Sequence, residues 1–193
     1  MAAVSVPHDA KFDFDAVIVG AGFAGMSMLH RLRELGMKAQ VYEAGSDVGG
    51  TWYWNRYPGA RCDVVSMEYS YAFSDELQQE WEWEEKYATQ PEILKYAQHC
   101  ADRFDLRRDI KFNTRVESAS FDETMGCWEV ETNTAERVTA QHLVLALGTL
   151  SATNYPDIEG RDMFEGSTYH TGAWPHGGVD FTDRRVGILS LIH

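Results

Sequence analysis

The strongest constraint on the fold is a glycine-rich turn near the start of the chain, set between an apolar run and a helical pattern. The run covers residues 16–19, the turn contains Gly20, Gly22 and Gly25, and apolar residues then recur at helical spacing as far as Leu35. In such a unit the first glycine makes a sharp turn, the second admits a pyrophosphate to the backbone, and the third lets helix and strand pack closely. The pattern predicts an α/β fold with a nucleotide-binding turn.

An acidic residue at the end of the next predicted strand strengthens this interpretation. Gly36 ends the helix, residues 39–42 form the strand, and Glu43 follows 18 residues after Gly25. A carboxylate in this place accepts hydrogen bonds from ribose hydroxyls and repels a 2′-phosphate, so we predict FAD or NAD at this site and not NADP. The alternative, glycines of an ordinary turn, does not explain why strand, helix and acid stand in register.

Composition and charge restrict the partners of the chain. The 193 residues fit one domain, and the formal net charge of −13 argues against nucleic acid or an anionic membrane as a partner. No apolar stretch approaches the roughly 20 residues of a membrane span, and residues 1–11 lack the features of a leader, so we expect a cytoplasmic protein. The spacing of Cys62, Cys100 and Cys127 fits neither a disulfide framework nor zinc, and we expect no metal site.

A second glycine-rich loop, residues 44–50, leads into the aromatic residues Trp52, Tyr53, Trp54 and Tyr57. Paired glycines let a backbone run close to a flat ligand, and clustered aromatic rings form an apolar wall. We interpret the cluster as a wall for a flavin ring, and an aromatic core is the alternative. Residues 57–60 predict a type II turn that places residues 61–63 on a rigid corner, where Asp63 is either a chemical group or the acceptor of an Asx turn.

The rest of the chain predicts helices, then a meander, then a buried strand. Residues 74–106 have a helical pattern with Pro91 in a first turn. Three alternating runs, residues 110–116, 128–132 and 137–139, predict a three-stranded antiparallel meander. The continuously apolar run 142–149 predicts a parallel strand, with a second ligand approach at Gly148.

Two strands of a nucleotide-binding unit, a helix, a meander and a returning parallel strand resemble the FAD domain of glutathione-reductase-like flavoproteins. Within that group, residues 49–63 resemble type I Baeyer–Villiger monooxygenases, especially the phenylacetone and steroid members. The fingerprint F-x-G-x-x-x-H-x-x-x-W-P of these enzymes fits at every fixed position, namely Phe164, Gly166, His170, Trp174 and Pro175. Related N-oxidising flavin monooxygenases carry Tyr or Phe where this chain has Trp174 and Pro175.

The resemblance implies a Rossmann-like FAD-binding domain and a defined reaction. In this family NADPH reduces FAD, the reduced flavin captures O₂, and a flavin peroxide converts a ketone to an ester or lactone. The implied partners are thus a small-molecule ketone and O₂. Two alternatives remain open: a non-catalytic FAD-binding module, and an N-hydroxylating flavin monooxygenase.

The resemblance also implies roles for individual residues. Gly20, Gly22 and Gly25 would hold the pyrophosphate, Glu43 the ribose, and Val116 the adenine through its backbone. Asp63 would in addition orient the active-site arginine of the family, and Arg61 would lie on the NADP side. His170 and Trp174 would link the two nucleotide domains. The residues expected on the flavin side are Gly50, Thr51, Trp52, Asp63 and Tyr69.

The resemblance divides the chain into four parts: an N-terminal arm (1–14), an FAD-binding domain (15–155), a fingerprint linker (156–184) and the start of an NADPH-binding domain (185–193). Residues 190–193 cannot form the glycine turn of that last domain. We therefore expect a C-terminally truncated chain, unable to turn over a ketone alone. We also expect an open sheet edge through which the chain can self-associate.

Overall fold

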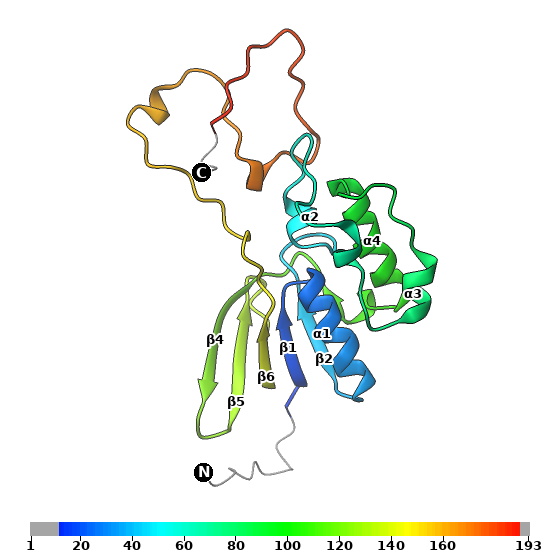
Figure 1. The fold of residues 1–193 in the computed structure, drawn as a ribbon. Coiled ribbons are helices and arrows are strands. Elements are labelled where there is room, and N and C mark those ends of the chain that lie inside the picture. The colour runs from blue at the N-terminus through cyan, green and yellow to red at the C-terminus, as the bar shows by residue number, and fades with distance from the viewer. Residues whose placement is uncertain (1–11, 190–193) are drawn as a thin grey trace.

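Four parallel strands and two antiparallel strands form one six-stranded sheet in the computed structural model, which describes residues 12–189 (Figure 1). The order across the sheet is β3-β2-β1-β6-β5-β4, in which β3, β2, β1 and β6 are parallel and β5 and β4 are antiparallel. The bounds are β1 Phe14–Val19, β2 Ala39–Tyr42, β3 Ile110–Lys111, β4 Val116–Asp122, β5 Cys127–Thr132 and β6 Arg137–Leu145. The predicted class, a parallel α/β sheet joined to a meander, is confirmed.

Helices cover one face of the parallel strands. The helices are α1 Phe23–Glu34, α2 Thr51–Trp54, α3 Asp75–Glu80 and α4 Gln90–Arg103, and the 3₁₀ turns are η1 Ser66–Tyr69, η2 Arg107–Asp109, η3 Arg161–Met163 and η4 Thr171–Ala173. Figure 1 shows α1 against β1 and β2, with α4 and α3 beyond it. The described residues after β6 contain only η3 and η4 and are mostly exposed.

The apolar run of β1 is continuous because both of its faces are buried. Ala16 and Ile18 pack toward α1 and α4, whereas Val17 lies on the other face in a cluster with side chains of β5 and β6. All three residues are completely inaccessible to solvent. A strand buried on both faces excludes polar residues from both, which produces the uninterrupted pattern in the sequence.

The predicted helix ends are confirmed. Gly36 has φ +73° and its N–H donates to the Arg33 carbonyl at 3.0 Å, so a left-handed glycine terminates α1. Pro91 lies in the first turn of α4, where its missing N–H costs nothing. Residues 81–89, which the helical pattern included, are not helical: they form an irregular connection with bends between α3 and α4.

The prediction for the meander is partly wrong. Residues 110–116 do not form its first strand, because residues 110–111 pair in parallel with β2 as β3. The meander consists of β4, β5 and β6, and the run 137–139 belongs to the same strand as residues 142–145, the first half of the run 142–149. β6 pairs with β5 through residues 137–140 and with β1 through residues 140–145. One long strand therefore joins the meander to the parallel sheet, which the local alternation of apolar and polar residues does not predict.

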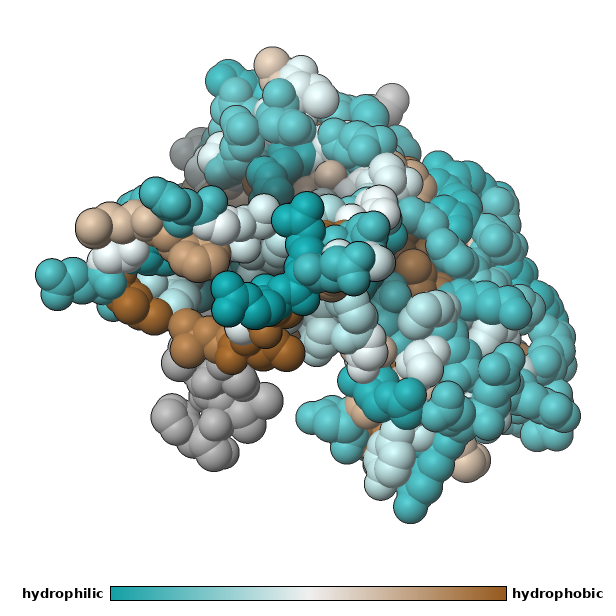
Figure 2. Space-filling view, turned by 90° about the horizontal axis from the view of Figure 1, so that it is seen from above, coloured by the Kyte–Doolittle hydropathy of each residue, from teal (hydrophilic) through white to brown (hydrophobic). Residues whose placement is uncertain are grey.

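The second half of β6 has a free edge within the described part of the chain. β5 pairs with β6 only as far as Ala140, and the apolar side chains Leu145, Leu147 and Leu150 are 64%, 51% and 62% exposed. Seen from above in Figure 2, hydrophobic side chains gather along one margin of the molecule. Within residues 12–189, every helix falls short of the length and apolar character that crossing a membrane requires.

Candidate functional site

The glycine turn after β1 packs so tightly that side chains are excluded from two positions. A Cβ atom on Gly25 would lie 1.9 Å from the Gly20 carbonyl oxygen, and one on Gly20 would lie 2.7 Å from the Ala146 carbonyl oxygen. Gly20 also has φ +101°, which L-residues with a side chain rarely adopt. The first and third glycines therefore bring α1 and the end of β6 against the turn.

The middle glycine touches the second glycine-rich loop. A Cβ atom on Gly22 would lie 3.4 Å from the Cα atom of Gly50, and one on Gly50 would lie 2.8 Å from the Cα atom of Gly22. The Gly49 N–H donates to the Ala21 carbonyl at 3.1 Å, which fixes the two loops to each other. The structure thus brings together the glycines that the sequence places nearly 30 residues apart.

Glu43 lies between the glycine turn and the chain that follows β3. Its carboxylate accepts the Ala21 N–H at one oxygen and the Gly45 N–H at the other, both at 2.7 Å, and the residue is 5% exposed. Its backbone carbonyl accepts the Thr114 N–H at 2.9 Å. Each carboxylate oxygen can accept a further hydrogen bond, so the group is able to hold vicinal hydroxyls beside the turn.

The N-terminus of α1 is open to an anion. Its N-cap is Gly22, no side chain of residues 12–189 caps its N–H groups, and its first turn contains no acidic residue. The free N–H groups and the positive end of the helix dipole favour a phosphate there. A cavity of about 350 Å³ opens beside this end of the helix, and its lining residues are Phe23, Ala24, Ser27, Glu68, Tyr69, Ser70 and Tyr71.

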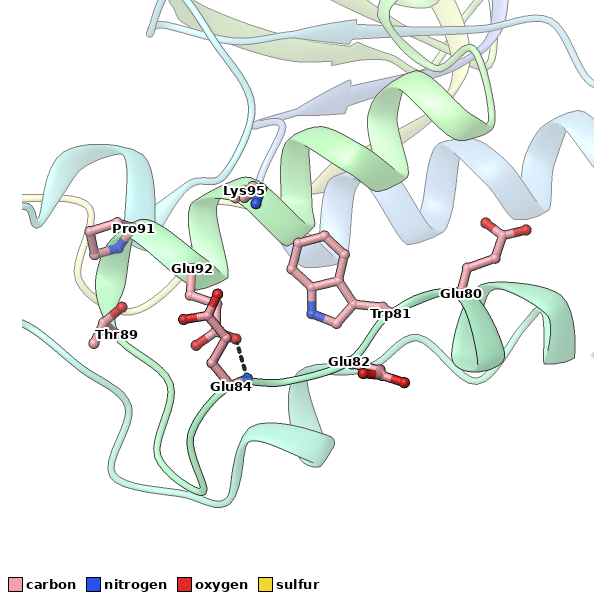
Figure 3. A pocket seen from close by; sticks show the side chains of 8 residues that line it. All are labelled: Glu80, Trp81, Glu82, Glu84, Thr89, Pro91, Glu92 and Lys95. Atoms are coloured by element: carbon pink, nitrogen blue, oxygen red, sulfur yellow. Dashed lines mark hydrogen bonds between the residues drawn. The ribbon is translucent and has the colours of Figure 1, made fainter.

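A larger cavity, of about 420 Å³, lies between α4 and the connection that precedes it (Figure 3). Four of its eight lining residues are glutamates, and the Glu84 N–H donates to the Glu92 carboxylate at 2.7 Å. None of the residues that the sequence predicts to bind a cofactor lines this cavity. So acidic a wall repels phosphate, and the glycine turn is the better site for a nucleotide.

The residues predicted on the flavin side gather around α2. Thr51 begins α2, and Trp52 is buried with its ring edge-on to Tyr69 at 5.6 Å. Burial raises the pKa of the Tyr69 phenol. Trp52 lies in a buried cluster with Cys62 and Ile93, an arrangement that fits both a wall for a flavin ring and the alternative of an aromatic core.

The corner at residues 61–63 is formed as predicted. The Ala60 N–H donates to the Tyr57 carbonyl at 3.1 Å and Gly59 has φ +79°, the geometry of a type II turn. Arg61 pairs with Glu85 at 3.0 Å. Asp63 is exposed, and its carboxylate has no hydrogen bond or ion pair with any of residues 12–189.

Val116 and Gly148 lie at the same edge of the sheet as the glycine turn. Val116 is the first residue of β4, pairs with Thr132 and packs against Tyr42. Gly148 has φ +70° with open space around its Cα atom, and it follows Ala146, which contacts Gly20.

The fingerprint residues lie in the segment after β6, away from the glycine turn. The Gly172 N–H donates to His170 Nδ1 at 3.0 Å, and the His170 ring lies 4.7 Å from Tyr155. Trp174 packs against Tyr169 at 5.6 Å. Phe164 is 64% exposed, and Gly166 and Pro175 are also exposed.

Two residues that sequence reasoning missed connect parts of this region. The Asp47 carboxylate accepts the Val48 N–H at 2.8 Å and the Gln98 amide at 2.7 Å, and it pairs with Arg107. Burial alone raises the pKa of Asp47, but the hydrogen bonds from Arg107 and Gln98 outweigh it and lower that pKa. His176 lies 5.1 Å from the Tyr53 ring and attaches the fingerprint segment to α2. No local pattern marks either residue, because both contacts are long-range.

Residues 17–180 match the family of pyridine nucleotide-disulphide oxidoreductases. The chain belongs to this family. Among curated members, it is 52% identical over 178 residues to a Baeyer–Villiger monooxygenase of Pseudooceanicola batsensis, covering 92% of this chain and 32% of that protein. It is 48% identical over 180 residues to phenazine N-monooxygenase PhzNO1 of Lysobacter antibioticus, covering 93% of this chain and 33% of that protein.

Solved structures of this oxidoreductase family have the same fold. An oxidised steroid monooxygenase bound to NADP is 59% identical with a TM-score of 0.81, covering 87% of this chain and 32% of that one. The complex of OTEMO with FAD and NADP is 46% identical with a TM-score of 0.84, covering 91% of this chain and 34% of that one. The resemblance to Baeyer–Villiger monooxygenases is thus confirmed. The chain spans about a third of the length of the curated relatives it matches.

Proposed function

We propose that the edge of the sheet formed by the glycine turn and Glu43 binds FAD. The observation that carries this proposal is the buried Glu43 carboxylate, whose two oxygens accept the N–H groups of Ala21 in the turn and of Gly45, each with an N···O distance of 2.7 Å. The residues present fit the group, because Gly22 and Gly50 leave the backbone bare where a pyrophosphate approaches. The uncapped N-terminus of α1 lies beside them.

In this proposal the residues of the chain bind and orient the cofactor. Gly20, Gly22 and Gly25 hold the pyrophosphate with the amides of α1, and Glu43 accepts the ribose hydroxyls. Val116 contacts the adenine through its backbone, and Gly148 lets a ligand approach the end of β6. When bound, FAD supplies the electron transfer and oxygen chemistry. The residues assigned to the flavin side are Gly50, Thr51, Trp52, Asp63 and Tyr69.

We further propose that the whole protein is a Baeyer–Villiger monooxygenase that uses NADPH and O₂ to convert a ketone to an ester or lactone. Its support is the 52% identity to a Baeyer–Villiger monooxygenase, together with the residues Trp174 and Pro175 of the fingerprint. Asp63 then orients the active-site arginine, and Arg61 lies on the NADP side. The proposal includes a cytoplasmic location, the division at residues 15–155, 156–184 and 185–193, and self-association through the free edge of β6.

The similarity to phenazine N-monooxygenase favours N-oxidation as a second candidate. A longer form of the protein offered a ketone or an aromatic amine, each with FAD and NADPH, separates the two activities by its product. The chain of 193 residues, given FAD, NADPH and a ketone, separates an enzyme from a module that only binds FAD. Oxidation of NADPH that depends on the ketone would establish the former.

The binding proposal is tested by titrating the chain with FAD and following the quenching of flavin fluorescence. Saturable quenching is expected, and Glu43→Gln should weaken binding about 10-fold or more, because a hydrogen bond to a charged group contributes roughly 1.5–3 kcal/mol. Glu129→Gln is the matched control: it removes the same charge from an exposed position on β5. Equal affinity of the Glu43→Gln variant and the unaltered chain would contradict the proposal.

A further inference from the structure

The strand order arranges three structural features in the order of the parts of a dinucleotide. β1, β2 and β3 are neighbours in the sheet, and they are followed by the glycine turn, by Glu43 and by residues 112–115. Parallel strands present their carboxyl ends at one edge, so the three features lie side by side there. With the diphosphate at the turn and the ribose at Glu43, the base lies beside residues 112–115.

Hydrogen bonds connect these features directly. The Ala21 N–H donates to the Glu43 carboxylate on one side, and the Thr114 N–H donates to the Glu43 carbonyl on the other, at 2.7 and 2.9 Å. Arg115 follows, and its backbone is held in both directions by Asn133, each hydrogen bond being 2.9 Å long. The hydrogen bond from Thr114 to Glu43 and the two hydrogen bonds with Asn133 therefore fix the position of the Arg115 backbone relative to Glu43.

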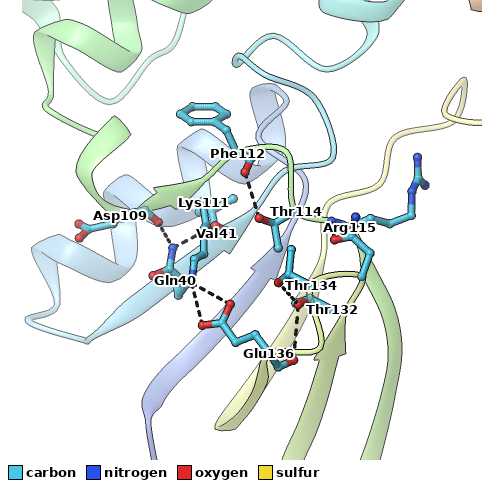
Figure 4. Close-up of polar contacts among 11 residues, drawn as sticks. Gln40, Val41, Asp109, Lys111, Phe112, Thr114, Arg115, Thr132, Thr134 and Glu136 are labelled. Atoms are coloured by element: carbon cyan, nitrogen blue, oxygen red, sulfur yellow. Dashed lines mark hydrogen bonds and ion pairs between the residues drawn. The ribbon is translucent and has the colours of Figure 1, made fainter.

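The side chain of Arg115 has no partner among residues 12–189. Figure 4 shows it extending away from the polar contacts of Thr132, Thr134 and Glu136, with no hydrogen bond or ion pair drawn to its guanidinium group. Every other arginine of residues 12–145 holds a carboxylate or a carbonyl oxygen, as seen for Arg31, Arg33, Arg56, Arg61, Arg103, Arg107, Arg108 and Arg137. Within residues 12–145, Arg115 is therefore the one arginine whose guanidinium group holds no carboxylate or carbonyl oxygen.

We propose that the Arg115 guanidinium stacks on the adenine ring of the bound dinucleotide and selects ligands that carry adenine. This inference rests on the proposed FAD site. A planar guanidinium stacks on aromatic faces, whereas an ammonium group acts as a point charge. Arg115 is long and exposed on a fixed backbone, which allows it to cover a base placed beyond Glu43.

The test compares the binding of FAD and ADP, measured by calorimetry, to the chain and three variants. Arg115→Met retains a long apolar stem and loses the planar charge, so FAD and ADP should bind about 3- to 10-fold more weakly. Arg115→Lys keeps the positive charge but lacks the planar guanidinium group, so this variant should still bind both ligands more weakly than the unaltered chain does. Arg31→Met, which removes an exposed arginine at the far end of α1, should leave both affinities unchanged.

Each outcome decides the proposal. Unchanged affinity of Arg115→Met for both ligands overturns it, and full recovery with Arg115→Lys overturns the stacking by assigning the effect to charge. Circular dichroism checks that each variant is folded. If Arg115→Met does not fold, Arg115→Lys decides: weaker binding than by the unaltered chain supports the proposal, and binding equal to that of the unaltered chain refutes it. If the unaltered chain binds neither FAD nor ADP, the proposed function fails and the inference with it.

Discussion

Replacing Gly25 with alanine tests the close packing at the glycine turn. The new Cβ atom would lie 1.9 Å from the Gly20 carbonyl oxygen, whereas ordinary contacts begin near 3.4 Å. The two backbones would have to separate by about 1.5 Å, because the clash is with main chain and not with the end of a flexible side chain. Strand β1 and helix α1 would therefore lose their close approach.

Two opposing effects set the size of the change. Alanine is favoured over glycine inside a helix by about 1 kcal/mol, which alone would stabilise α1. Overpacking of a rigid interior costs about 1–3 kcal/mol and occasionally more, and a clash as short as this one belongs at the upper end. We expect a net loss of about 2 kcal/mol, a large part of the roughly 5–15 kcal/mol by which a domain is stable.

The assay is urea unfolding followed by tryptophan fluorescence, since the chain has six tryptophans. With a slope of about 2 kcal/mol per molar urea, the midpoint should fall by about 1 M. Gly177→Ala is the control, because no atom lies within 4 Å of its added Cβ, and its midpoint should stay within error. A midpoint for Gly25→Ala equal to or above that of the unaltered chain would refute the reasoning.

Two further predictions concern buried polar groups. Tyr42→Phe removes a buried hydroxyl group that has no hydrogen-bond partner among residues 12–189, so the free energy of unfolding should rise by about 1 kcal/mol, and a clear fall in the midpoint of thermal unfolding would contradict this. Asp47→Asn should lower the free energy of unfolding at pH 7 by about 1 kcal/mol, since it breaks the pair with Arg107. Because the pKa of Asp47 is lowered in the folded state, its contribution to the free energy of unfolding is present above about pH 4 and is lost as the pH falls through the folded-state pKa. The stabilities of the variant and the unaltered chain should therefore become equal in acid. A stability difference that does not change with pH would contradict the assignment.

Much of the fold follows from local sequence. Strand β2 was predicted at its observed bounds and β1 to within two residues of its start, because strands buried on both faces and bounded by glycines leave an unambiguous pattern. The errors lie where pairing is not local. Residues 110–111 look like one more alternating strand, and only their distance from β2 in space decides that they join the parallel sheet.

For the candidate site, the sequence indicated the glycines and Glu43, which the structure brings together, because a turn, a close approach and a carboxylate each require a particular residue type at a fixed spacing. Their role in binding stays a prediction. The sequence did not indicate Asp47, His176 or the Arg115 side chain, because the partners of the first two, and the lack of a polar partner for Arg115 among residues 12–189, depend on residues far away in the chain.

The sequence by itself determined the strand, turn and helix of the glycine-rich unit and the family resemblance, since steric demands on the backbone act between near neighbours. Only the tertiary structure decided that β6 serves both the meander and the parallel sheet, that Gly22 touches Gly50, and that the Arg115 side chain has no polar partner among residues 12–189. These are outcomes of packing, in which the energy of a residue depends on which distant segment lies against it.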